Sequence, residues 1–147
     1  MQTIRKRKGK GKVWIIILSI AGVIVLGVGG AILATAPGRN ELKNLTIEAV
    51  DFKKLRDGVY TGVYRGKKDS TRNAGVEVTV ASGAVTKIKV TEGALADEKQ
   101  TSEVRNGLSI NDLFNRVIKS QSLKVDVISG ATLTSNAHLK AVENALE

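Results

Sequence analysis

The hydrophobic positions of this 147-residue chain fall into two regions of different character. Residues 13–36 carry no charged side chain and are rich in Ile, Val, Leu, Gly and Ala. This segment exceeds the roughly 20 apolar residues that a helix needs to cross the hydrocarbon core of a bilayer. Beyond it, apolar and polar residues alternate over short stretches, which is typical of strands and amphipathic helices. The pattern predicts one transmembrane helix followed by one globular domain.

The residues around the apolar segment predict its orientation. Six basic residues and no acidic ones lie in the tail of residues 1–12, which places the N-terminus in the cytoplasm and everything after Pro37 outside. A cleavable signal peptide is the alternative, because Ala34–Ala36 resembles a small-residue cleavage site. However, the apolar segment is longer than the roughly 7–15 residues of a signal peptide core, and proline follows the site directly. We therefore expect an uncleaved, single-pass anchor in the lipid bilayer of the cell membrane.

The extracytoplasmic part divides into a linker and a domain. Residues 37–56 are expected to form a juxtamembrane linker, with a short helix over 47–55, and residues 57–147 the domain. Apolar and polar residues alternate from Val76 to Val90 on both sides of a Ser-Gly turn, which predicts a hairpin with one buried face. Residues 91–107 lack periodicity and are predicted to form a loop or an irregular helix.

A Gly-Val-Tyr sequence occurs twice within residues 58–66 and predicts a further strand. In such a strand Tyr60 and Tyr64 share one face. The glycines of this segment have two interpretations. They can mark bulges or strand ends, or they can allow a flat ligand to approach the backbone.

Two helices complete the predicted domain. The sequence Ser109–Asp112 resembles a capping box, and the apolar residues behind it follow the spacing of an amphipathic helix. The short apolar run 125–128 predicts a strand. The last helix is expected to begin near Thr134 or Ser135, with His138 exposed one turn later. The predicted fold class is α+β, a small, mainly antiparallel sheet with packed helices, preceded by the transmembrane helix.

Charge and composition exclude several functions. The net charge is +9, but six of the 23 basic residues belong to the tail, and the remaining 17 are interspersed with 14 acidic residues. The basic tail therefore suits membrane topology, and we expect no nucleic-acid partner. With no cysteine and one histidine, the chain is not expected to hold a metal, an iron–sulfur cluster or a c-type haem. Any redox function then requires an organic cofactor.

The strongest candidate for chemistry is the segment from Asp126 to Ser135. It places four hydroxyl side chains around Gly130, where a turn leads into the last helix; they belong to Ser129, Thr132, Thr134 and Ser135. The free amides of a helix N-terminus favour a phosphate there, so a hydroxyl could react with a phosphoryl group or carry a phosphoester. The alternative is that the hydroxyls only cap the helix, and composition by itself favours that alternative.

This segment, Asp126-Val-Ile-Ser-Gly-Ala-Thr-Leu-Thr-Ser135, resembles the flavinylation motif of the FMN-binding domain family. The family includes subunits of the Na⁺-translocating NADH:quinone oxidoreductase and of Rnf complexes. The resemblance covers about residues 47–147 and includes Asp57–Gly66, the hairpin and Gln121–Asp126. It implies an FMN bound covalently by a phosphoester to Thr132. The other cofactor-binding residues that it implies are Asp126, Ser129, Gly130, Ala131, Leu133, Thr134 and Ser135.

The resemblance also implies how the flavin is attached and what it does. A separate, Mg²⁺-dependent flavin transferase would move the FMN moiety from FAD onto the threonine. Small membrane-anchored members occur in bacteria, so the expected function is extracytoplasmic electron transport, with a quinol or a quinone reductase as membrane redox partner and no catalytic residue. Two alternatives are a small flavin-dependent extracellular reductase and a non-redox anchored binding module. Residues 91–107 depart from the family pattern, which puts partner contacts there in doubt.

Overall fold

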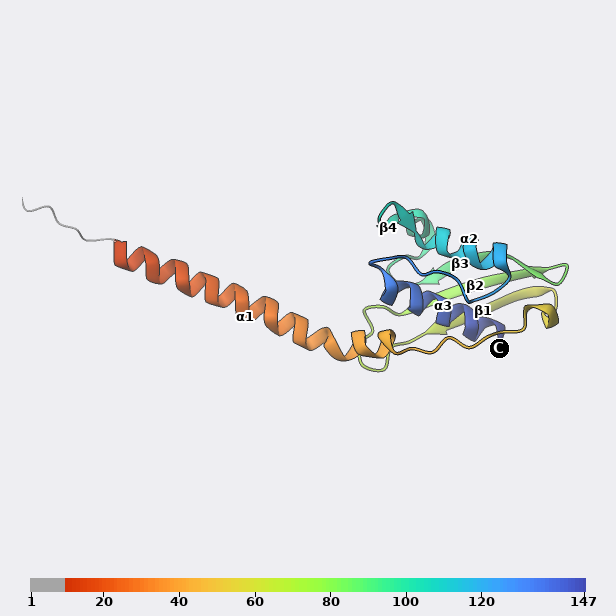
Figure 1. The fold of residues 1–147 in the computed structure, drawn as a ribbon, viewed down its shortest axis with the longest axis horizontal. Helices are drawn as coiled ribbons and strands as arrows, with labels where there is room; N and C mark the ends of the chain where they lie inside the picture. Colours follow the sequence, from red (N-terminus) through yellow and green to blue (C-terminus); the bar gives the residue numbers. More distant parts are fainter. Residues whose placement is uncertain (1–9) are drawn as a thin grey trace, which may run out of the picture. The chain divides into compact units, whose positions relative to one another are not determined.

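Helix α1 (Lys10–Lys43) begins the part of the chain that the computed structural model describes, residues 10–147. By length and composition its residues Gly11–Lys43 could cross a membrane, so α1 is a candidate membrane span that contains the expected segment 13–36. Residues 1–9 of the expected tail lie outside the described residues. The chain divides into two compact units, Met1–Ala36 and Pro37–Glu147, and the second holds all the other elements (Figure 1).

The second unit contains a three-stranded antiparallel sheet in the order β1–β2–β3. Its strands are β1 (Gly58–Tyr64), β2 (Ala74–Ala81) and β3 (Ala84–Glu92). The predicted hairpin is confirmed, since β2 and β3 pair directly across a tight turn. The two turn amides donate to the carboxylate of Asp57 over 2.9 and 2.8 Å. These bonds, chiefly the one from Gly83, lower the pKa of Asp57.

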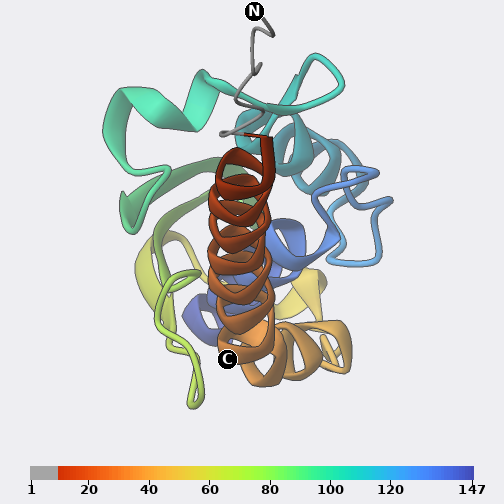
Figure 2. The same ribbon diagram turned by 90° about the vertical axis from the view of Figure 1, so that its left-hand side faces the viewer.

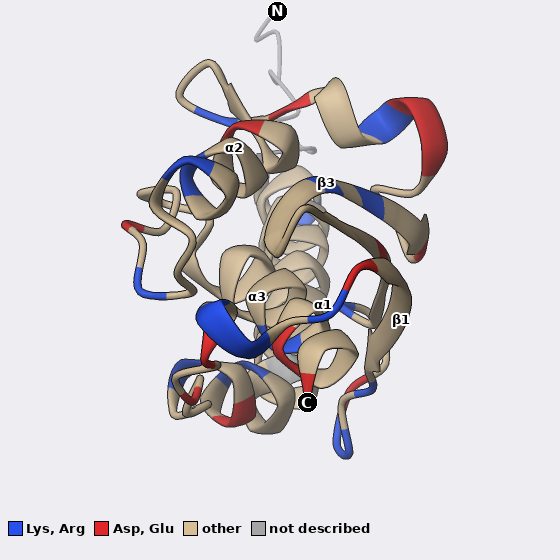
Figure 3. Cartoon of the chain, turned by 90° about the vertical axis from the view of Figure 1, so that its right-hand side faces the viewer, with Lys and Arg blue, Asp and Glu red and all other residues tan. Residues whose placement is uncertain are grey.

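The helices α2 (Ile110–Ser120) and α3 (Thr132–Leu146) cover one face of this sheet (Figures 2 and 3). The predicted capping box of α2 is confirmed, with the Asp112 carboxylate accepting from the Ser109 amide over 2.7 Å. The core lies between the layers and is made of the inward side chains of all three strands and both helices. Basic and acidic residues are interspersed along the strands, helices and loops of this unit (Figure 3). The fold is therefore α+β, as the sequence predicted.

Glycine 62 is the position at which α3 lies closest to the sheet. A Cβ at residue 62 would collide with the carbonyl oxygen of Ala141 and the amide nitrogen of Ala145, which are backbone atoms of α3. Further along the same face, the buried side chain of Tyr64 belongs to the core. Of the two interpretations of these glycines, a close approach to the backbone holds at residue 62, but the approaching partner is a helix and not a ligand.

Two glutamine side chains cover the outer edge of β3. Gln100 accepts from the Val90 amide over 2.7 Å and donates to the Ile88 carbonyl over 3.0 Å. Gln121 makes the same pair of bonds with the backbone of Val85, over 2.9 and 2.8 Å. An open strand edge invites pairing with another chain. The two amides occupy this edge instead, and they attach the segments before and after α2 to the sheet.

The segment after α1 is attached to α3 by a buried carboxylate. Glu143 is fully buried; its carboxylate accepts from the Glu48 amide over 3.0 Å and pairs with Lys140 over 2.5 Å. Among the described residues, only one cluster of three acidic side chains is close enough together to hold a metal ion; it consists of Glu48, Glu143 and Glu147. Because Glu143 already has two partners, this group is accounted for as a structural anchor.

Four local predictions differ from the structure. The first residues of the expected linker continue α1 to Lys43, and the predicted helix over 47–55 is reduced to the 3-10 helix η1 (Phe52–Lys54). The last helix begins two residues early, at Thr132. The predicted strand 125–128 is wrong, because this extended segment pairs with side chains instead of a strand. The Asp126 carbonyl accepts from Arg116 over 2.6 Å, for example.

Replacement of Gly62 by alanine should destabilise the domain by about 1–3 kcal/mol, the usual cost of overpacking a core. The added methyl group meets rigid backbone in α3, which must move away from β1. The measurement is thermal unfolding of the full chain in detergent. Thr61→Ala is the matched control, because Thr61 is exposed on the same strand and its loss should change stability by less than about 0.5 kcal/mol. Equal melting temperatures for the two variants would contradict the contact.

Candidate functional site

A tight turn joins the extended segment 125–128 to α3. The Ala131 amide donates to the Ile128 carbonyl over 2.9 Å, which closes the turn around Ser129 and Gly130. Gly130 has a φ of 79°, in the left-handed region that glycine enters without strain. A Cβ at this position would also lie 3.0 Å from Nε of Arg105. The turn therefore favours glycine for its backbone angle, and the absence of a side chain leaves room for Arg105.

The N-terminus of α3 is open. Ala131 is the N-cap residue, and no side chain caps the first turn. The amides of residues 132–134 have no intrahelical acceptor, because the first helical bond runs from the Ser135 amide to the Ala131 carbonyl over 2.9 Å. Uncapped amides at the positive end of a helix dipole stabilise an anion such as a phosphate. Thr132, the first residue of the helix, is exposed at this position.

The structure separates the four hydroxyls of the segment. Ser135 is fully buried; it accepts from the Ile128 amide over 3.2 Å and donates to the Ala131 carbonyl over 2.9 Å. It therefore supports the turn and is not available for chemistry. Thr134 is partly buried, whereas Ser129 and Thr132 are exposed. Capping was the alternative role for these hydroxyls. Ser135 has a related structural role: it lies within the first turn of the helix, not at the N-cap, and it bonds to the backbone of the preceding turn.

The remaining predicted site residues surround this turn. Asp126 is exposed before it, and Leu133 is partly buried after Thr132. The carbonyl of Asp126 is held by Arg116, so that α2 contributes to the position of the segment. Ala131 provides the N-cap without a polar side chain.

A second hairpin flanks the turn. It consists of β4 (Glu103–Arg105) and β5 (Leu108–Ser109), which pair antiparallel around Asn106 and Gly107. Asn106 Nδ2 donates to the Ser129 carbonyl over 3.1 Å, and the exposed Arg105 lies against Gly130. A guanidinium therefore lies beside the open helix end. This part of the irregular segment 91–107 carries site residues that the sequence patterns did not reveal.

A cavity of about 160 Å³ lies beside the first two turns of α3. Four segments contribute to it: the loop that leads into β2, the loop before the 3-10 helix η2 (Asp97–Thr101), strand β4 and α3. Its lining residues are Thr71, Arg72, Asn73, Ala94, Leu95, Val104, Thr134 and His138. The cavity thus combines an apolar wall with several polar groups from different elements.

His138 is a buried residue of the cavity wall, and the expectation that it would be exposed is wrong. Only 5% of its surface is accessible, and its ring packs against Phe114 with the centroids 6.2 Å apart. Its Nδ1 lies 2.7 Å from the Thr134 carbonyl, which can only accept, so Nδ1 carries the proton. Nε2 is buried and has no hydrogen-bond partner. Burial lowers the pKa of His138, although the Thr134 bond opposes this effect.

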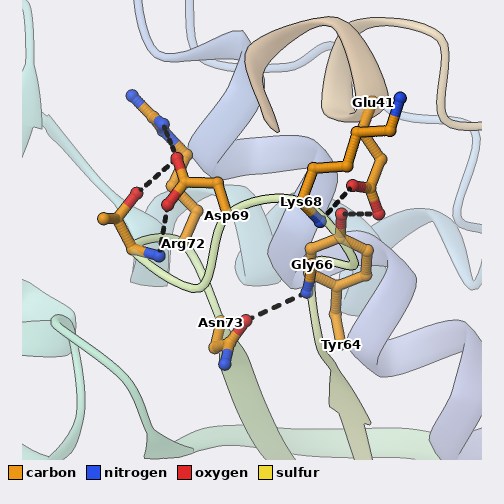
Figure 4. A network of polar contacts seen from close by, with 8 residues as sticks. Glu41, Tyr64, Gly66, Lys68, Asp69, Arg72 and Asn73 are labelled. Atoms are coloured by element: carbon orange, nitrogen blue, oxygen red, sulfur yellow. Dashed lines mark hydrogen bonds and ion pairs between the residues drawn. The ribbon is translucent and has the colours of Figure 1, made fainter. Parts of the chain in front are cut away.

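A network of polar contacts holds the cavity residues of the loop before β2 (Figure 4). Asn73 accepts from the Gly66 amide over 3.0 Å, and Asp69 lies 3.7 Å from the Arg72 guanidinium. On the other side of this loop, Glu41 accepts from the Lys67 and Lys68 amides over 3.0 and 3.1 Å. The end of α1 therefore helps to order the loop that leads into the cavity.

The two tyrosines of β1 have structural roles. Tyr64 donates to the Glu41 carboxylate over 3.2 Å, and burial together with this charge raises its pKa to about 12. Tyr60 donates to the Arg56 carbonyl over 2.8 Å. Neither residue is part of the cavity wall.

The pKa shift of His138 predicts a pH dependence of stability. Because its folded pKa lies below the ordinary 6.5, the unfolded chain takes up the proton first as the pH falls. Stability should therefore decrease from about pH 6.5 downwards until the folded pKa is reached. The carboxylates Asp57 and Asp112, whose pKa values are lowered, lose their contribution only below about 3.8, in a separate window.

The measurement is the melting temperature of the full chain in detergent at several pH values between about 7.5 and about 5. This range includes the ordinary histidine pKa of about 6.5. His138→Phe is the control, since phenylalanine keeps a ring against Phe114 but cannot take up a proton. The variant should show a flatter profile than the parent. An equal slope in both proteins would mean that His138 does not cause it.

The donor set at the start of α3 fits a phosphate, and the cavity beside it offers an apolar wall with polar groups. The sequence model of a family described as FMN-binding domain matches residues 71–147. A search of curated proteins finds no match. The matched region contains Arg105, the Gly130 turn, Thr132 and all the cavity residues, whereas β1 precedes it and is joined to it by pairing with β2. Because the match covers more than half of the chain and the whole candidate site, the chain belongs to the FMN-binding domain family.

Proposed function

We propose that this protein is a membrane-anchored, extracytoplasmic electron carrier whose FMN is attached to Thr132 by a phosphoester. The observation that supports this most directly is the exposure of Thr132 as the first residue of a 15-residue helix with an uncapped first turn. A hydroxyl at this position lies where the backbone itself favours a phosphate. Membership of the FMN-binding domain family supports FMN as the group that the phosphate belongs to.

The residues around Thr132 have defined roles in this proposal. The amides of residues 132–134 would donate to the phosphate oxygens, and the Arg105 guanidinium beside Gly130 would balance the phosphate charge. The exposed threonine hydroxyl is accessible to a separate flavin transferase that supplies the FMN moiety from FAD with Mg²⁺. Ser135 and Asn106 would keep the turn in place during this reaction.

The bound flavin would supply electron transfer, which no side chain of this chain can provide. A covalent tether suits a domain outside the cytoplasm, because a cofactor that dissociates there is lost by dilution. The candidate membrane span would keep the domain close to a membrane redox partner, a quinol or a quinone reductase. The basic residues before the span support an orientation with the domain outside.

Thr132→Ala should abolish covalent flavinylation. The chain is co-expressed with a flavin transferase and separated on a denaturing gel, and flavin fluorescence is measured in its band. The matched control is Thr134→Ala, which removes the hydroxyl of a partly buried threonine in the same turn and should keep the fluorescent band. A fluorescent band in Thr132→Ala would show that the attachment site is wrong.

The orientation can be tested with single cysteines, because the chain has none of its own. Lys119→Cys, at an exposed position at the end of α2, should react with a membrane-impermeant thiol reagent in intact cells. Thr3→Cys should react only after the membrane is permeabilised. The reverse labelling pattern would place the domain in the cytoplasm and contradict the proposal.

A further inference from the structure

We propose that the cavity beside α3 receives the pyrimidine end of the flavin ring, with Nε2 of His138 accepting a hydrogen bond from the flavin N3–H. This inference rests on the proposed function, since it concerns an FMN attached at Thr132. It assigns a role to the one buried side-chain atom without a partner among the described residues.

The donor and acceptor pattern of the cavity matches that end of the ring. The pyrimidine end of an isoalloxazine carries one N–H donor between two carbonyl acceptors. The Nδ1 proton of His138 is held by the Thr134 carbonyl, so Nε2 can only accept. Arg72 and Thr134 line the cavity together with His138, and their side chains are donors for the two carbonyl groups. The apolar wall formed by Ala94, Leu95 and Val104 suits the faces of a flat ring.

The burial of His138 keeps this acceptor in the required state. Burial lowers the pKa of the imidazole, so the ring is neutral near pH 7 and Nε2 keeps its lone pair. Arg72 is the charged residue of the cavity lining, and its guanidinium lies 3.7 Å from the Asp69 carboxylate. A buried acceptor without a partner costs free energy, which a bound donor recovers.

Size and reach indicate that only one end of the ring enters. The cavity of about 160 Å³ is smaller than the pockets that enclose whole ligands, which measure roughly 300–1,000 Å³. His138 lies six residues after Thr132, which is about 9 Å along a helix that rises 1.5 Å per residue. The phosphate and ribityl chain of FMN separate its ring from the point of attachment by a comparable length.

The first test fills the cavity. Ala94 is exposed at the cavity wall, so that Ala94→Trp can occupy the space without disturbing the core. The flavinylated full chain is purified in detergent, and iodide quenching of the flavin fluorescence and the visible circular dichroism are measured. The variant should keep its covalent flavin, and its quenching should rise several-fold as the dichroism falls. Ala81→Trp is the matched control, at the exposed end of β2 opposite the cavity, and should match the parent.

The second test addresses the hydrogen bond itself. The resonance Raman band of the flavin N3–H bend, identified by its shift in D₂O, is compared in the parent, His138→Phe and His138→Gln. Phenylalanine removes the acceptor and keeps a ring against Phe114, so the band should move to its position in a flavin without this bond. Glutamine can accept through its side-chain oxygen, so the band should return toward the parent position. Melting temperatures show whether each variant is folded.

The outcomes separate this inference from the function on which it rests. Covalent flavin with equal quenching in the parent and Ala94→Trp would overturn the ring site and leave the carrier function intact. A ring site sensitive to Ala94→Trp, with the same Raman band in all His138 variants, would overturn the hydrogen bond and indicate that the dimethylbenzene end enters. A chain that takes no covalent flavin would overturn both.

Discussion

The close packing of α3 on the backbone of β1 is the constraint on which the rest of the domain depends. At Gly62 the helix lies so close to the strand that even a methyl group would displace it. This contact presses a face of α3 into the core, and Ala141, Val142 and Leu139 are buried as a result. Because the helix is held along its length, its first residue and its cavity-facing residues have defined positions.

The first turn of α3 combines a rigid support with an open end. Ser135 joins the turn to the helix from inside, while Asn106 holds it from the neighbouring hairpin. No side chain occupies the amides that point away from the helix. Such an arrangement suits an anion, because the amides are already in position and little ordering would be required for a phosphate to bind. Thr132, the first residue of this helix, is exposed, so its hydroxyl is accessible to a modifying enzyme.

The periodic elements of the domain were predictable, and the elements without a sequence period were not. Alternation identified the β2–β3 hairpin, and the capping box with its apolar spacing identified α2. The segment 125–128 has the composition of a strand, yet the edge of β3 is covered by glutamine side chains instead of a fourth strand. A short apolar run indicates that a segment is buried, but it does not indicate which groups form hydrogen bonds with the backbone of that segment.

Sequence alone determined the candidate membrane span, the hydroxyl-rich turn before the last helix and the family to which that turn belongs. Each of these features is defined by residues that are adjacent or close in the sequence, so a short stretch of sequence is enough to identify it. Only the tertiary structure decided that Arg105 lies beside Gly130, that Ser135 is buried while Thr132 is exposed, and that His138 borders a cavity. The reason is that the contacts of Arg105 and of the cavity residues join segments far apart in the chain, and the burial of Ser135 depends on how α3 packs in the domain.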